Sequence, residues 1–128
     1  MHSSYKSKGG PARLIHALRY SIQGLAAAFR HEAAFRQELL LTVVLLPVAL
    51  WISRTLLEAV LMIGALVLVL IVELLNSALE ALADTITTEH HPMVGRAKDL
   101  GSAAVLLALG LAALIWLGVI GTHISGSL

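Results

Sequence analysis

Residues 72–84 read VELLNSALEALAD. They contain neither Gly nor Pro and are rich in Leu, Ala and Glu, which predicts a helix. The polar side chains recur at helical spacing and so share one face; they are Glu73, Asn76, Ser77, Glu80 and Asp84. Residues 59–72 before them carry no charge. A carboxylate that follows such a run is costly in lipid, so this face is expected to meet a site, a partner or water. The alternative is an ordinary membrane helix that ends in water.

The composition indicates one membrane-embedded domain. The chain has 128 residues, of which 58% are hydrophobic and 13% charged, and its mean hydropathy is +0.86. These values are extreme for a soluble protein. The chain has no Cys, so neither disulfides nor Cys-based zinc sites are expected. A net charge of +1 and 5% aromatic residues argue against a nucleic-acid partner and favour the bilayer.

Three apolar segments predict three transmembrane helices. They are residues 39–52, 56–75 (interrupted by Glu58 and Glu73) and 103–120. About 20 residues are needed to cross the hydrocarbon core, so the first segment spans only if its helix continues upstream through Glu38. Pro47 is expected to kink that helix. The predicted helices are about 33–52, 55–84 and 97–121, the second extending into the cytoplasm.

The basic residues predict the orientation. Six Lys and Arg precede the first span, two lie between the second and third, and only Arg54 lies in the other loop. Positive residues favour the cytoplasmic side, which predicts a cytoplasmic N-terminus and a periplasmic C-terminus.

Before the spans, an amphipathic surface helix is predicted over about 11–31. Residues 1–10 are Ser-, Lys- and Gly-rich and are expected to be disordered, whereas Pro11 can open a helix. Apolar residues then recur at helical spacing, with basic residues elsewhere on the wheel, as in helices that lie on a membrane. A helix packed on the bundle is the alternative. The domain is expected to cover 11–123 and to leave a tail at 124–128.

The connections offer weaker signals. Thr55 and Glu58 form a possible capping box, which makes a structural role the better interpretation of Glu58. His90 and His91 are adjacent in the loop 85–94 without further ligands at metal spacing, so they are interpreted as loop residues. Gly110, Gly118 and Gly121 could allow close helix approach in the third span.

The residues suit two chemistries. From Leu56 to Glu73 a helix rises about 25 Å, which carries Glu73 nearly to the cytoplasmic boundary, with Glu80 and Asp84 beyond it. Three carboxylates on one face favour a divalent cation between them. Together with the basic Arg96 and Lys98 these parts suit phosphoryl transfer, and equally a proton- or cation-conducting bundle. No P-loop or kinase-type HRD or DFG motif is present.

Three blocks carry a more specific signal: EAAFRQE at 32–38, VELLNSALEALAD at 72–84 and GRAKDLGSAAV at 95–105. In this order they resemble the prokaryotic integral-membrane diacylglycerol kinase family, and the likeness extends from Arg13 to His123. It implies an ATP- and Mg²⁺-dependent kinase that converts diacylglycerol to phosphatidic acid at the bacterial inner membrane. It also implies a homotrimer with three transmembrane helices and a surface helix per chain, and active sites shared between subunits.

The resemblance also implies roles for individual residues. Glu73 would be the general base, supported by Asn76, and Glu32 and Glu80 would hold the metal. The nucleotide would be contacted by Arg13, Tyr20, Glu32, Glu80, Glu89, His90, His91, Lys98 and Asp99. The lipid would be met by Arg13, Ser21, Ala34, Phe35, Arg36, Gln37, Glu38, Glu73 and Ser102. His90 stands where the family usually has Tyr.

Other interpretations stay open at this point. An undecaprenol kinase of the same family would share these carboxylates and differ in substrate. A small ion- or proton-conducting oligomer would use Glu73 as its intramembrane site. A structural membrane subunit would tolerate neutral residues at the Glu positions.

Overall fold

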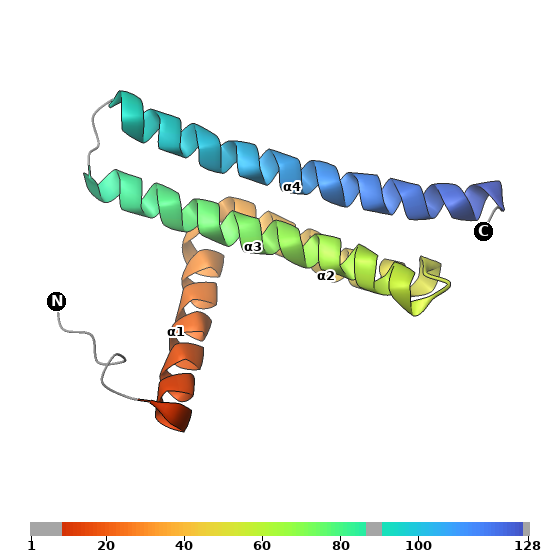
Figure 1. The fold of residues 1–128 in the computed structure, drawn as a ribbon, viewed down its shortest axis with the longest axis horizontal. Coiled ribbons are helices and arrows are strands. Elements are labelled where there is room, and N and C mark those ends of the chain that lie inside the picture. The colour runs from red at the N-terminus through yellow and green to blue at the C-terminus, as the bar shows by residue number, and fades with distance from the viewer. Residues whose placement is uncertain (1–8, 87–90, 127–128) are drawn as a thin grey trace. The chain divides into compact units, whose positions relative to one another are not determined.

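The computed structural model describes residues 9–86 and 91–126, and these residues form four helices and no strand. In chain order the helices are α1 (Gly10–His31), α2 (Ala33–Ile52), α3 (Leu56–Ile86) and α4 (Pro92–Ser125) (Figure 1). The predicted all-α fold is confirmed. The predicted roles of Glu89 and His90 fall outside the described residues.

The chain divides into two compact units, one up to Ala33 and one from Ala34 onward. The first unit holds α1, in which a Pro occupies the first turn as expected. Its apolar side chains are exposed, including Leu14, Leu18 and Ile22. A single extended residue, Glu32, ends α1, and its backbone N–H donates to Ala28 O at 2.9 Å. The single domain expected over residues 11–123 stays a prediction.

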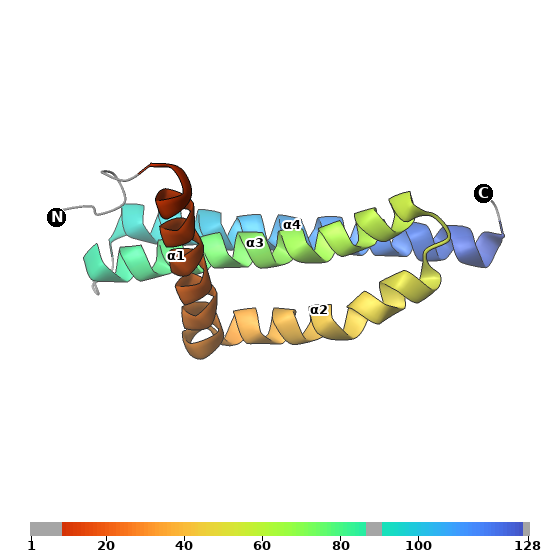
Figure 2. The same ribbon diagram turned by 90° about the horizontal axis from the view of Figure 1, so that it is seen from below.

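In the second unit α2, α3 and α4 are each long and apolar enough to cross a membrane. The three predicted apolar segments are thus confirmed as helices of membrane-spanning length. The structure also confirms that the first continues upstream through Glu38, since α2 begins at Ala33. Pro47 lies inside α2, and Figure 2 shows that this helix bends over its second half. Proline lacks the N–H of a helical hydrogen bond, which accounts for the bend.

α3 and α4 run antiparallel and side by side, and they form the main helix–helix contact of the unit (Figure 1). The inner face of α3 carries Met62, Leu66 and Val69, all buried. The Trp116 indole of α4 donates from Nε1 to Met62 O at 3.1 Å. Most other large apolar side chains of the unit are exposed, as expected for surfaces that meet lipid or other protein chains.

At one end of this unit a polar cluster joins α4 to the connection between α2 and α3. The Glu58 N–H donates to Thr55 Oγ1 at 3.1 Å, and the Arg54 N–H donates to Glu58 Oε1 at 2.9 Å. Arg54 also donates from its guanidinium to Glu58 Oε2 at 3.3 Å and to Thr122 Oγ1 at 3.0 Å. Glu58 is therefore structural, as predicted, although it caps the N–H of Arg54 and not that of Thr55.

The ends of α4 differ from the expected range 97–121. The helix begins at Pro92 because His91 caps it, with Nδ1 accepting from the Met93 N–H at 3.2 Å. At the other end it continues to Ser125 and stops at Gly126, whose φ of 69° is the left-handed conformation that glycine tolerates. The loop predicted at 85–94 and the tail predicted at 124–128 are thus both too long, since α3 reaches Ile86 and α4 reaches Ser125.

Candidate active site

The candidate site is centred on Glu73, which lies on the inner face of α3. Its position continues the row of buried residues that includes Leu66 and Val69, and its exposed fraction is only 5%. Ser77, one turn further, is also buried and donates from Oγ to Glu73 Oε2 at 3.3 Å. A carboxylate thus occupies a place where the helix otherwise carries apolar residues. Burial of a charge at such cost is typical of a functional position.

Glu38 brings a second carboxyl group to this region from α2. Its carboxyl group lies close to that of Glu73. Its Oε1 is buried and has no hydrogen-bond partner among the described residues. A buried acceptor without a partner costs free energy, so this oxygen is available to a donor from a ligand.

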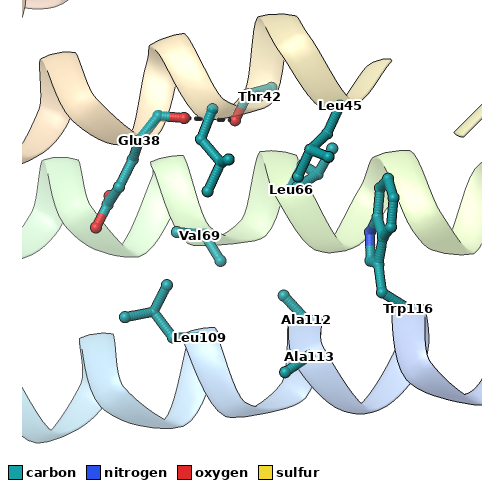
Figure 3. Close-up of a pocket in the computed structure, with 10 residues that line it drawn as sticks. Glu38, Thr42, Leu45, Leu66, Val69, Leu109, Ala112, Ala113 and Trp116 are labelled. Carbon is teal, nitrogen blue, oxygen red and sulfur yellow. Dashed lines mark hydrogen bonds between the residues drawn. The ribbon is translucent and has the colours of Figure 1, made fainter. Parts of the chain in front are cut away.

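Glu38 also stands at one end of a pocket of about 250 Å³ among α2, α3 and α4 (Figure 3). Thr42 lies beside it, with Oγ1 donating to Glu38 O at 2.8 Å. Trp116 stands at the other end in the view. The remaining lining is apolar and consists of Leu41, Leu45, Leu66, Val69, Leu109, Ala112 and Ala113. One carboxyl end and apolar walls suit an amphipathic molecule.

Asn76 adjoins Glu73 on α3 and packs against α4 at Gly101. Its Oδ1 is buried and, like Glu38 Oε1, unpartnered among the described residues. Glu80 is half-buried one turn beyond. The predicted stripe therefore begins in the packed interior of the three-helix unit at Glu73 and reaches the exposed Asp84.

Asp84 and Lys98 pair at the exposed end of this stripe. Lys98 Nζ donates to Asp84 Oδ1 at 2.7 Å, with side-chain exposures of 40% and 61%. Glu80 lies close enough to act on the Lys98 charge. Asp99 and Ser102 are exposed on the following turns of α4, and His91 is exposed at its N-cap.

The remaining predicted residues are less closely connected to Glu73. In the segment before Glu38, Phe35 is buried whereas Ala34, Arg36 and Gln37 are exposed. Arg13, Tyr20, Ser21 and Glu32 belong to the unit that ends at Ala33. Ser21 donates to Ala17 O within its own helix at 3.0 Å. The structure therefore brings Glu38 close to Glu73, while Asn76 and Glu80 follow Glu73 along α3. A Glu32–Glu80 metal pair stays a prediction.

Mg²⁺ is the metal that the proposed chemistry would use, and the described residues offer it carboxylates singly or in pairs. Among the described residues no three His, Asp or Glu side chains are gathered as a metal site. Mg²⁺ in phosphate-transfer sites is usually bound through one or two carboxylates together with substrate phosphates and waters. The half-buried Glu80 at the exposed end of the stripe fits that donor chemistry.

Gly101 is the part of the site that the sequence did not reveal. A Cβ atom built at residue 101 would overlap Asn76 Oδ1, whereas Gly110, Gly118 and Gly121 have no atom within 4 Å of such a position. Within this chain the expectation of close approach at those three glycines is therefore wrong. The signal in the sequence was only that Gly101 lies in the block GRAKDLGSAAV.

Carboxylates among membrane-crossing helices, beside an amphipathic pocket, define an integral membrane protein with an internal polar site. The family model for prokaryotic diacylglycerol kinase matches residues 19–120. The chain is 49% identical over 114 residues to the diacylglycerol kinase of Pseudomonas aeruginosa, covering 89% of this chain and 93% of that one. It is 45% identical over 116 residues to that of Haemophilus influenzae, covering 91% and 98%, and 46% identical over 114 residues to that of Escherichia coli K12, covering 89% and 93%.

The chain belongs to the prokaryotic diacylglycerol kinase family. This confirms the resemblance drawn from the three sequence blocks and the prediction that the chain is an enzyme. It is a bacterial membrane protein.

Proposed function

We propose that this protein transfers the γ-phosphoryl group of ATP to the free hydroxyl of diacylglycerol, which yields phosphatidic acid and ADP. The observation that carries the proposal is Glu73, a buried carboxylate among membrane-crossing helices in a chain of this family. Glu73 accepts the hydroxyl proton as the oxygen attacks the γ-phosphorus and the bond to ADP breaks. Ser77 holds the carboxylate in place by its hydrogen bond.

The pocket beside Glu38 supports a lipid as the acceptor. Its carboxyl end suits the glycerol hydroxyl, and its apolar walls suit the first part of an acyl chain. By the family likeness the lipid also meets Arg13, Ser21, the segment 34–37 and Ser102. The pocket is lined by three helices that are apolar enough to cross a membrane, which supports access from the bilayer, where diacylglycerol resides.

The water-soluble substrate binds further along the same helix. By the family likeness Glu80 and Glu32 would hold Mg²⁺, which would supply positive charge to offset that of the phosphates, and Asn76 would support the site beside Glu73. Lys98 contacts the nucleotide together with Arg13, Tyr20, Glu89, His90, His91 and Asp99. Lys98 is already paired with Asp84, so nucleotide binding exchanges one anionic partner for another.

Assembly and orientation complete the proposal. α1 lies on the cytoplasmic membrane surface as an amphipathic helix, the N-terminus is cytoplasmic and the C-terminus periplasmic. Three copies form a homotrimer with shared sites at the bacterial inner membrane. The large exposed apolar faces and the small buried core of one copy support such an assembly.

The test is phosphate transfer from MgATP by the purified protein in mixed micelles, with diacylglycerol and undecaprenol offered side by side. We expect preferential phosphorylation of diacylglycerol, abolished when EDTA removes Mg²⁺. A preference for undecaprenol would keep the reaction and overturn the substrate. No transfer to either lipid by folded, oligomeric protein would overturn the kinase proposal, and bilayer conductance independent of ATP would favour an ion-conducting oligomer.

A further inference from the structure

At Gly101 the backbone of α4 packs directly against a side chain of α3, that of Asn76. A Cβ atom built on Gly101 would overlap Asn76 Oδ1 and lie 3.4 Å from Asn76 Cγ and 3.8 Å from Leu79 Cδ2. The Asn76 amide therefore occupies the space that any other residue at 101 would need.

This contact is a local property of α4 and not a general feature of its glycines. Gly95 and Gly110, on either side along the same helix, have no atom within 4 Å of a built Cβ. Gly101 also has no positive φ, so the backbone conformation does not require glycine there. Space for Asn76 is the physical reason for glycine at this position.

Packing against Gly101 restricts the position of the Asn76 amide but gives its oxygen no hydrogen bond. Asn76 Oδ1 is buried and has no hydrogen-bond partner among the described residues. The N–H of Gly101 donates to the carbonyl four residues earlier in α4, so it is not free to donate to Asn76 Oδ1. The χ1 torsion of Asn is limited to staggered wells, and the contact at Gly101 limits the otherwise broad rotation of the amide about χ2. The oxygen is thereby held ready for a donor that none of the described residues provides.

We propose that Gly101 is a positioning residue, whose missing side chain seats the Asn76 amide beside Glu73 in the geometry that turnover needs. The inference rests on the proposed function, in which Asn76 supports the site. It adds that residue 101 of α4 must lack a side chain, and that this affects turnover only through the position of Asn76.

The proposal predicts opposite effects of Gly101→Ala on folding and on turnover. Alanine favours the helix more than glycine does, so α4 itself gains stability. The new methyl group displaces the Asn76 amide, because the end of a side chain moves more readily than two packed backbones. Misplacement of a group by about 1 Å can cost roughly 100-fold in rate. We expect kcat to fall about 10- to 100-fold, with KM for MgATP within about twofold of the parent.

Asn76 is the only asparagine in the chain, so its amide can be observed without assignment. Protein labelled with ¹⁵N-asparagine gives a single side-chain amide pair in a heteronuclear NMR spectrum. We expect Gly101→Ala to shift or broaden that pair, and the matched control Gly110→Ala to leave both the pair and kcat unchanged. Activity of the parent protein tests the proposed function separately.

A double-mutant cycle isolates the route of the effect. In an Asn76→Ala background the overlap is gone, so adding Gly101→Ala should fold and cause no further loss of kcat. The proposal is overturned if Gly101→Ala keeps full activity, or if it costs as much with Ala at residue 76 as with Asn. It also falls if Asn76→Ala alone leaves kcat unchanged while the parent phosphorylates diacylglycerol.

Discussion

Replacing Glu73 with Gln separates its chemical role from its packing role. Gln has nearly the same shape, and its amide oxygen can still accept from Ser77 Oγ, now 3.3 Å from Glu73 Oε2. Hydrogen bonds to charged groups contribute about 1.5–3 kcal/mol and neutral ones about 0.5–1.5, so about 1 kcal/mol of stability is lost. Removing a charge close to the Glu38 carboxyl group offsets part of that loss. The free energy of unfolding should therefore change by less than about 1 kcal/mol.

Turnover should respond far more strongly than stability. A general base contributes about 10²- to 10⁴-fold in rate, which corresponds to roughly 2.7–5.5 kcal/mol of the barrier. The assay is kcat for lipid phosphorylation in mixed micelles, with unfolding followed by titration with SDS. Glu58→Gln is the matched control, because Glu58 lies on the same helix and binds Arg54 at the opposite end. The general-base assignment is refuted if folded Glu73→Gln keeps more than a tenth of the parent kcat, or if Glu58→Gln loses as much.

Three further changes test the packing of α3 and α4, each measured by SDS unfolding in mixed micelles. Met62→Ala removes a fully buried side chain. In soluble proteins such a change costs about 2–5 kcal/mol, part of which is the free energy of transfer from water. Here the unfolded state also lies in an apolar medium, so only the cavity term remains and we expect stability to fall by about 1–2 kcal/mol. A loss above about 4 kcal/mol would contradict this reasoning. Trp116→Phe removes the donor to Met62 O and should cost about 0.6 kcal/mol; no change on this substitution would mean that the bond contributes nothing. Lys98→Ala removes an exposed ion pair with Asp84 and should lower stability by about 0.2–1 kcal/mol. This loss should shrink at high salt because salt screens the pair. A loss that does not depend on salt would mean that Lys98 stabilises the helices by packing.

The sequence was sufficient for the helices because their signals are local. Apolar length predicted the three spans, and Pro11 marked the start of α1 within a residue. The early start of α4 was also within reach of local reasoning, since Pro92 favours the first turn of a helix and the preceding His91 caps it. The predicted start at about 97 followed the apolar run and overlooked that signal.

The site depends on which faces of the helices pack against one another. The spacing of residues within a single helix does not predict this. Helical periodicity placed Glu73 and Ser77 on one face, but only the packed structure brings Glu38 of α2 to the same carboxylate. The same holds for Gly101, whose importance arises from the side chain of Asn76 opposite it. Roles for residues before Ala34 relative to α3 came from family resemblance alone, and they stay predictions.

The polar cluster at the end of α4 has a practical consequence for handling this protein. Arg54 reaches Thr122, four residues before the glycine that terminates the helix. An affinity tag fused after Gly126 leaves this link in place, since the helix is already closed there. A deletion that begins at Thr122 removes the hydrogen-bond partner of Arg54, which lies in the turn between α2 and α3. A version shortened for crystallisation should therefore keep all residues up to and including His123.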